Sequence, residues 1–368
     1  MRSLQFGAYD NMIGNVVGSY MGYVQIHQNG YWEDKRIDKA LEYERLDSIK
    51  DIDGVVQIHE RIESFALANF NDRSKPVAIM GLDPDEEANH IQLDKRLIQG
   101  DYISSENQGL MLSKFLFEWM DVKIGDSISL LGQGYHGSIA AGNYPVVGVV
   151  DLKTPELNKR TIIMNRELAE DLYDLYGLVT TVVVHTNSKD WKRVQTKVNE
   201  NLGDEFEVMN WKEMLPELIQ LIRADKAGGT VVLIILYLIM AFGLFGTVLM
   251  SAEERTFEYG VLIAVGMKRH QLYRTHLLES LMISLLGLGV GAVLSLPLVT
   301  WFNIHPIRMG GDVQRIAERF GFEAVLPTSI DPKIFITQLL ILFVVVLLVN
   351  SYVFFKIKNL RPVAAMNS

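Results

Sequence analysis

Residues that could carry out catalysis or hold a metal ion are scattered along this sequence. The eight histidines show no metal-ligand spacing, and His27 and His59 lie in strand-like stretches where ordinary packed or exposed imidazoles are expected. Ser113 and Ser251 have no nearby base of the kind that activates a hydroxyl group. The absence of cysteine excludes disulfides, thiol catalysis and cysteine metal sites. We therefore predict no catalytic residue, no metal site and no cofactor site.

One acidic stretch has some features of a calcium-binding loop. Asp83-Pro-Asp-Glu-Glu87 is followed by Asp94, but Ala88 stands where the loop needs glycine, and an aspartate replaces the final glutamate. A turn that leads into a helix is the preferred interpretation, because acidic side chains are favourable at the positive end of a helix.

Nucleotide hydrolysis and nucleic-acid binding are both unexpected for this chain. The phosphate-binding motif Gly-x-x-x-x-Gly-Lys-Ser/Thr does not occur, and Gly228-Gly229 after Lys226 is no such loop. The net charge of -9 argues against a nucleic-acid partner, since binding to phosphates needs a basic surface. Any energy from ATP would have to come from another protein.

The last third of the chain contains three long apolar stretches, at about 228–250, 275–300 and 334–356. Each is long enough to cross a hydrocarbon layer about 30 Å thick. One such stretch would be compatible with a buried helix of a soluble protein, but three in one chain predict an α-helical membrane bundle, in a domain of residues 221–368.

Residues 23–220 have the mixed pattern of an α+β domain. Alternation predicts a strand at 22–27, and strand-like composition predicts strands at 55–70, 77–81, 144–151 and 179–185. Residues 122–131 are predicted to be a turn into a strand, with Gly125-Asp126 at the turn. Helical periodicity predicts helices at 4–21, 37–49, 167–176, 191–202 and 211–224, and residues 109–119 are helical or a strand followed by a helix.

The membrane topology follows from the order of the spans and the distribution of cations. Residues 251–276 and 356–368 fall on one face, and residues 1–226 and 301–333 on the other. The first face carries Arg255, Lys268, Arg269, Arg274, Lys356, Lys358 and Arg361, and the loop of the second face carries Arg308, Arg315, Arg319 and Lys333. The excess of cations places the first face in the cytoplasm and the large domain outside.

An exported domain needs a leader, and none is visible near Met1. Either the domain is cytosolic after all, or a first membrane helix precedes Met1. The helical pattern at 4–21 favours the second explanation, in which residues 1–22 form the outer end of that helix.

The short segment 251–270 between the first two spans is charged and amphipathic. By charge alone it would be an ordinary solvated face. However, Gly260 and Gly266 bracket the apolar run Val261–Val265, and a short helix of this kind suits a groove on a partner protein.

This segment resembles the coupling segment of the FtsX/MacB-type permeases of ABC transporters. The matching positions are Glu254, Arg255, Glu258, Gly260, Leu262, Ala264 and Gly266. The tail with Arg361-Pro362 is similar to the closing motif of the family, and Glu279 stands where the family has an acidic residue at the start of the next helix. The partner of Glu279 is left open between Arg255, Arg274 and a residue of an ATPase.

The soluble domain is similar to the extracytoplasmic domain of the lipoprotein-releasing permeases, the LolC/LolE type. Its matching stretches are Gly81–Pro84, Gly100, Gly109–Ser113 and Val122–Asp126. The resemblance implies four membrane helices, of which three are visible here. A truncated chain, a late start and an ATPase domain fused upstream all stay open.

Together these features predict a permease subunit in a bacterial inner membrane that has no enzyme activity of its own. The resemblance implies a partner ATPase that binds ATP and Mg, a second identical or homologous permease, and a lipoprotein or other amphiphile taken from membrane lipid as cargo. The alternative is an FtsX-like regulator that transmits movement to an extracellular partner such as a cell-wall hydrolase. A membrane-anchored enzyme ranks last.

Overall fold

The computed structural model describes residues 1–91, 93–104, 107–152, 155–187, 190–308, 310–311 and 325–359. The chain divides into two compact units, each described here by itself. The bundle unit consists of residues 1–9, 220–307 and 325–368, and the domain unit consists of residues 10–219 and 308–324.

The strands of the domain unit are centred on one long strand, β3 (Val55–Phe70). The others are β1 (Val24–Gln28), β2 (Leu41–Glu42), β4 (Arg73–Leu82), β5 (Leu97–Gly100), β6 (Leu110–Ser113), β7 (Ser127–Gln133), β8 (Ile139–Val150), β9 (Thr161–Asn165), β10 (Leu178–Val179), β11 (Thr181–Thr186) and β12 (Phe206–Asn210). Two short strands, β13 (Ile307–Arg308) and β14 (Val325–Leu326), lie later in the chain.

The two halves of β3 take part in two different arrangements. Its first half pairs with β11, which continues through β1 to β12. Its second half belongs to a series of paired strands in the order β3, β4, β9, β6, β8, β7. Strand β7 then returns to β3, with Leu131 opposite Leu67. The six strands close on themselves, which leaves them no unpaired edge.

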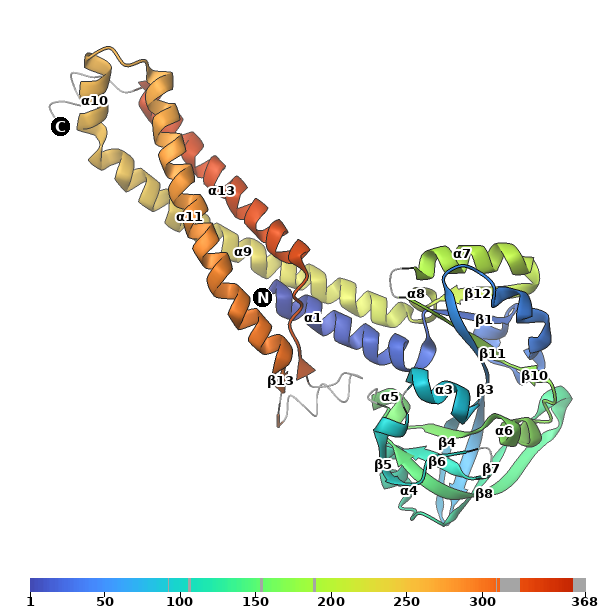
Figure 1. Ribbon diagram of the computed structural model, residues 1–368. Coiled ribbons are helices and arrows are strands. Elements are labelled where there is room, and N and C mark those ends of the chain that lie inside the picture. The colour runs from blue at the N-terminus through green and yellow to red at the C-terminus, as the bar shows by residue number, and fades with distance from the viewer. Residues whose placement is uncertain are drawn as a thin grey trace. The chain divides into compact units, whose positions relative to one another are not determined.

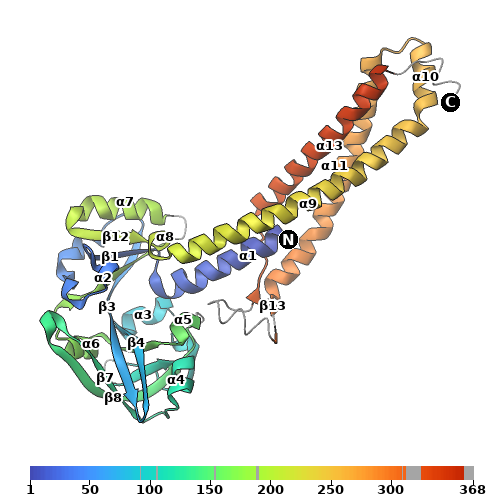
Figure 2. The ribbon, with the colours of Figure 1, turned by 180° about the vertical axis from the view of Figure 1, so that it is seen from behind.

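Short helices cover these strands, as Figures 1 and 2 show. They are α2 (Tyr31–Asp34), α3 (Pro84–Ile91), α4 (Lys114–Met120), α5 (Pro155–Asn158), α6 (Arg166–Tyr173), α7 (Trp191–Leu202) and α8 (Trp211–Met214). The 3₁₀ turns are η2 (Ile37–Lys39), η3 (Tyr43–Ile49), η4 (Asp94–Arg96), η5 (Tyr135–Gly137) and η6 (Gly203–Glu205).

Strand β1 is buried on both faces, although its alternating sequence predicts one polar face. Val24 and Ile26 pack in the main apolar core, while Gln25 and His27 are also fully buried. Their polar atoms are satisfied inside: Gln25 donates to the Met21 carbonyl at 2.7 Å, and the His27 ring lies 3.1 Å from the Thr180 carbonyl. Alternation therefore located the strand but not its environment.

The prediction of one helix over residues 37–49 is wrong. The structure has η2, the short strand β2 and η3 instead, because Leu41 and Glu42 pair with the two residues of β10. Four apolar residues of this segment are nevertheless buried: Ile37, Leu41, Leu46 and Ile49.

The single helix predicted over residues 211–224 is broken. Helix α8 ends at Met214, and Leu215 has φ -123° and ψ 57° before the next helix begins at Pro216. The ring of Pro216 disfavours the helical conformation in the residue before it, which explains the break.

The helix predicted over residues 4–21 has two parts. Helix α1 (Arg2–Ile13) is followed by a π-helix, η1 (Gly14–Met21). In the bundle unit a Cβ at Gly7 would lie 2.2 Å from the Pro327 carbonyl oxygen, so glycine permits a close backbone approach there.

The bundle unit contains three helices that are long and apolar enough to cross a membrane: α9 (Pro216–Glu254), α11 (Arg269–Ile304) and α13 (Pro332–Asn359). The short helix α10 (Thr256–Ala264) lies between the first two in the chain. The long helices run side by side in Figures 1 and 2, and almost none of their most apolar stretches is buried. Their side chains are therefore available to lipid or to other helices.

Five glycines of α9 and α11 have open space around them within the described residues. A Cβ at Gly243, Gly246, Gly287, Gly289 or Gly291 would meet nothing within 4 Å. Glycines allow helices to approach closely in a membrane, so a close approach at these positions requires a helix outside the described residues.

Candidate functional site

The segment that the sequence singles out forms a short helix between two spans. Helix α9 ends at Glu254, Arg255 leaves helical geometry with φ -94° and ψ 7°, and α10 begins at Thr256. Figure 1 shows α10 at the end of the bundle where α9 finishes and α11 begins.

The end of α10 is fixed by its backbone. The Met267 N–H donates to the Leu262 carbonyl at 3.0 Å, and the Gly266 N–H donates to the Ile263 carbonyl at 3.1 Å. This pair of bonds defines a Schellman motif, which needs a residue of positive φ at its turn. Gly266 supplies it with φ +108°. The glycine therefore sets the angle between α10 and α11.

One face of α10 packs on the bundle. Tyr259 and Gly260 are buried, and Tyr259 belongs to an apolar cluster with members on all three spans: Ala252, Leu272, Val353 and Ile357. The Tyr259 hydroxyl also lies 2.9 Å from Nδ1 of His276 on α11. Movement of α10 would therefore be transmitted directly to the helices beneath it.

Two ion pairs link the helices at this end of the bundle. Nη1 of Arg255 lies 2.7 and 2.6 Å from the two carboxylate oxygens of Glu279 on α11. Glu253 pairs with Lys356 of α13. Arg255 is thus the partner of Glu279 among the three choices that the sequence leaves open. Since Arg255 and Glu279 are both 40% exposed, solvent screens the pair and its contribution to stability is small.

The opposite face of α10 is exposed and largely apolar. Phe257 is 55% exposed, Leu262 42% and the following Val265 84%, and Glu258 is the exposed acid among them. An exposed helical face of this kind suits a groove on another protein.

The positions named by the resemblance divide between these two faces. Glu254, Glu258, Leu262, Ala264 and Gly266 are exposed, Arg255 is half-buried, and Gly260 is buried. A bulky residue at Gly260 would therefore act by displacing α10 from the bundle. Arg361 and Pro362 of the tail, like Arg315 and Arg319 of the second-face loop, lie outside the described residues.

The acidic stretch at residues 83–87 has a structural role. Asp83 Oδ1 accepts from the N–H groups of Asp85 and Glu86 at 3.0 and 3.2 Å, so it caps the start of α3. Glu87 is fully buried and forms an ion pair with Arg61. Within the described residues no group of three His, Cys, Asp or Glu side chains could hold a metal ion.

The sequence reasoning missed Arg61, which is completely buried on β3. Its Nε lies 2.7 Å from Glu87 Oε1, and Nη1 donates to the Tyr20 carbonyl of η1 at 2.5 Å. A single arginine within a long strand carries no periodic signal, so only the fold reveals this pairing.

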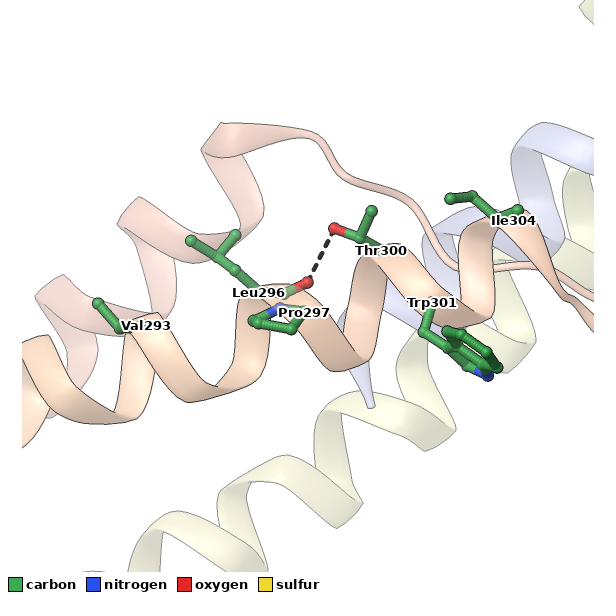
Figure 3. Close-up of a pocket in the computed structure, with 6 residues that line it drawn as sticks. All are labelled: Val293, Leu296, Pro297, Thr300, Trp301 and Ile304. Atoms are coloured by element: carbon green, nitrogen blue, oxygen red, sulfur yellow. Dashed lines mark hydrogen bonds between the residues drawn. The ribbon is translucent and has the colours of Figure 1, made fainter.

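Helix α11 has a shallow recess at Pro297 (Figure 3). All six of its lining residues come from this one helix: Val293, Leu296, Pro297, Thr300, Trp301 and Ile304. The hydroxyl of Thr300 donates to the Leu296 carbonyl at 2.8 Å and is already used. The recess is consistent with a surface exposed to lipid.

The membrane helices and α10 are similar to a known protein family. Residues 230–362, which include α10, match the model of the FtsX-like permease C-terminal family. The similarity to this family therefore covers α10, α11, α13 and the greater part of α9.

Three curated relatives are similar to parts of the chain. The macrolide export ATP-binding/permease protein MacB 2 of Aeromonas hydrophila is 35% identical over 86 residues, which is 23% of this chain and 13% of that protein. MacB of Campylobacter jejuni is 32% identical over 88 residues, covering 23% and 14%. The uncharacterized ABC transporter permease YknZ of Bacillus subtilis is 22% identical over 275 residues, covering 67% and 64%. The chain thus spans less than two thirds of each relative.

The solved structures that resemble this chain are similar at low identity. The periplasmic region of MacB from Actinobacillus actinomycetemcomitans gives a TM-score of 0.39 at 13% identity, covering 56% of this chain and 95% of that one. The extracellular domain of the transporter YknZ from Gram-positive bacteria gives 0.36 at 13%, covering 51% and 100%. Taken with the family match, the sequence similarities support the FtsX/MacB superfamily, while the lipoprotein-releasing type stays a prediction.

Proposed function

We propose that this chain is the permease subunit of an ABC transporter, and that α10 is the surface by which a partner ATPase moves the membrane helices. One observation carries the proposal: α10 exposes Phe257, Leu262 and Val265 on one face while its other face is packed and hydrogen-bonded to the spans. A helix that contacts the ATPase on one face and the spans on the other can transmit movement between them.

The role of this chain is to transmit movement of the partner ATPase to the membrane helices. ATP and Mg bind to the partner, because the sequence has no phosphate-binding loop. Closure of the ATPase displaces α10. The Schellman turn at Gly266 and the Arg255–Glu279 pair carry that displacement into α11, and the Tyr259 cluster carries it into α9 and α13.

The distribution of charge supports a cytoplasmic α10. Lys268, Arg269 and Arg274 follow α10, and Lys356 and Lys358 lie at the end of α13 that the order of spans puts on the same face. Cations accumulate on the cytoplasmic side of membrane proteins, which supports an extracytoplasmic domain unit. The location we propose is the bacterial inner membrane.

The exposed spans support a second permease, identical or homologous. The apolar stretches of α9, α11 and α13 are almost wholly unburied within the chain, and their glycines leave room for a further helix. The cargo we propose is a lipoprotein or another amphiphile released from the membrane into the extracytoplasmic domain. The second candidate is an FtsX-like regulator that acts on an extracellular partner such as a cell-wall hydrolase.

Site-specific photocrosslinking in intact cells tests the coupling surface. A photoreactive residue at Leu262 should crosslink to a nucleotide-binding protein, and the same residue at Trp119, which is 44% exposed in the domain unit, should not. Equal crosslinking of the ATPase to both positions, or of Leu262 to lipid only, would contradict the proposal. Copurification of lipoprotein and lipid favours the transporter, whereas copurification of a soluble hydrolase favours the regulator.

A further inference from the structure

A cavity of about 600 Å³ lies inside the bundle unit, between α1, α9 and α13. Its polar end is lined by Arg2, Lys226, Asp331 and Lys333, and its apolar wall includes Leu233 and Ile334. It is separate from α10, and neither the sequence reasoning nor the proposed coupling mechanism uses it. Figure 1 shows α1 beside α9 at this end of the bundle.

The charges of the cavity are unbalanced. Three cations face one acid, and among the described residues none of Arg2, Lys226 and Lys333 forms an ion pair within 4.0 Å. The acid is already engaged, because Asp331 Oδ1 accepts from the Lys333 backbone N–H at 3.0 Å at the start of α13. Both lysines are exposed residues and are available to an anion.

Arg2 is held in position by its neighbours. Its Nη2 donates to the hydroxyl of Thr230 at 3.0 Å, and its Nη1 donates to Gln5 at 3.0 Å. These bonds are neutral, so the guanidinium keeps its full charge towards the cavity. A positioned arginine beside two lysines suits phosphate oxygens, which accept several charge-assisted hydrogen bonds at once.

The cavity crosses the boundary between polar and apolar parts of the helices. Lys226 immediately precedes the uncharged stretch 227–250, and Lys333 immediately precedes the uncharged stretch 334–355. The lining continues along α9 from Lys226 to Tyr237, a length of roughly 16 Å at the helical rise per residue. A ligand that fills it would need a charged head and an apolar tail.

The walls are fixed by contacts within the bundle unit. Tyr9 donates to Asp225 of α9 at 2.6 Å, and the Ser3 hydroxyl donates to the Ser329 carbonyl at 2.6 Å. Gly7 of α1 also lies close to the backbone of Pro327. The three walls therefore exist before any ligand binds, which lowers the entropic cost of binding.

We propose that this cavity binds an anionic membrane phospholipid, with its phosphate between Arg2, Lys226 and Lys333 and its upper acyl chains against Leu233, Ile234 and Ile334. The excess of two positive charges selects a lipid of net negative charge over a zwitterionic one. The apolar wall selects a lipid over free phosphate. The proposal depends on the membrane location of the spans and is independent of the ATPase.

The test measures binding of a fluorescent short-chain phosphatidylglycerol to the purified full chain in non-ionic detergent. Phosphatidylcholine with the same chains and inorganic phosphate serve as comparison ligands. Replacing both cavity lysines, K226Q/K333Q, should weaken binding of phosphatidylglycerol about thirty-fold. This factor corresponds to the usual contribution of one cation near an anionic lipid surface, counted once for each lysine. The matched control K95Q/K123Q removes two exposed lysines of the domain unit and should bind as the wild type does.

A second variant tests the apolar part of the cavity. Thr337 lines the cavity and is exposed, so T337W should fill the space without disturbing the fold and should abolish binding of both lipids. Circular dichroism should show unchanged helix content for every variant. Unchanged affinity for phosphatidylglycerol in K226Q/K333Q or in T337W would overturn the proposal, as would complete displacement of the lipid by an equal concentration of inorganic phosphate.

Discussion

Arg255 and Glu279 form an ion pair in which one guanidinium nitrogen lies 2.7 and 2.6 Å from the two carboxylate oxygens. The arginine immediately precedes α10 and the glutamate lies on α11, so the pair links the start of α10 to the next span. Because both side chains are 40% exposed, the pair adds little to stability. The role of the ion pair is to hold α10 at one orientation relative to α11.

Removing either charge should uncouple α10 from the spans without unfolding the protein. We expect R255Q and E279Q each to lower the free energy of unfolding by less than about 1 kcal/mol and to reduce ATPase stimulation in the complex several-fold. The exchanged pair R255E/E279R should recover much of the stimulation, and R274Q, at an exposed arginine of α11, should have little effect. If the exchanged pair behaves no better than the single variants, the contact does not transmit movement.

Replacing Gly266 should strain the turn after α10. A side chain at φ +108° is unfavourable, so G266A should destabilise the bundle end by about 1 kcal/mol. Faster cleavage near residue 266 in limited proteolysis measures this loss. The control G243A lies inside a helix with open space around its Cβ and should be neutral or slightly stabilising. Equal cleavage of both variants would contradict the role of the Schellman turn.

Acid should destabilise the domain unit through His27. Burial lowers the pKa of His27 to about 3, against a weaker opposing effect of its bond to the Thr180 carbonyl. The unfolded chain therefore binds the proton more readily below about pH 6.5, and stability falls as the pH drops. Between pH 7 and pH 5 we expect a loss of about 2 kcal/mol from this group.

Urea unfolding at several pH values, followed by tryptophan fluorescence, measures that loss. H27Q should give a flatter dependence on pH, although it lowers stability overall. The control H136Q removes an exposed imidazole and should keep the slope of the wild type. A slope that is the same in H27Q and the wild type would show that another group is responsible.

Breaking the buried Arg61–Glu87 pair should be costly. Both side chains are fully buried, so E87Q removes the closer carboxylate partner of Arg61 and leaves only Glu63, at 3.9 Å. We expect it to destabilise the domain unit by about 3–5 kcal/mol. D85N, at an exposed acid of the same helix, should change stability by less than about 0.5 kcal/mol. A small effect of E87Q on the urea midpoint would mean that water reaches the arginine.

The sequence by itself determined the features that depend on hydrophobic periodicity and on local backbone chemistry. The three spans could be predicted because lipid requires about 20 consecutive apolar residues, and α7 could be predicted from its helical period. Gly266 could be recognised as a helix end because a turn of positive φ favours glycine. The site residues on α10 were found by resemblance, and their coupling role stays a prediction.

Only the tertiary structure decided which partners these residues meet. Arg255 pairs with Glu279, and Arg61 pairs with Glu87, although the members of each pair are distant in the chain. The burial of Gly260 likewise depends on how α10 packs on the spans. The break at Leu41–Glu42 likewise arises because β10 supplies hydrogen bonds that a helix would have made internally. Local patterns carry no information about such partners, because a side chain's contacts are set by how the elements pack and not by its neighbours along the chain.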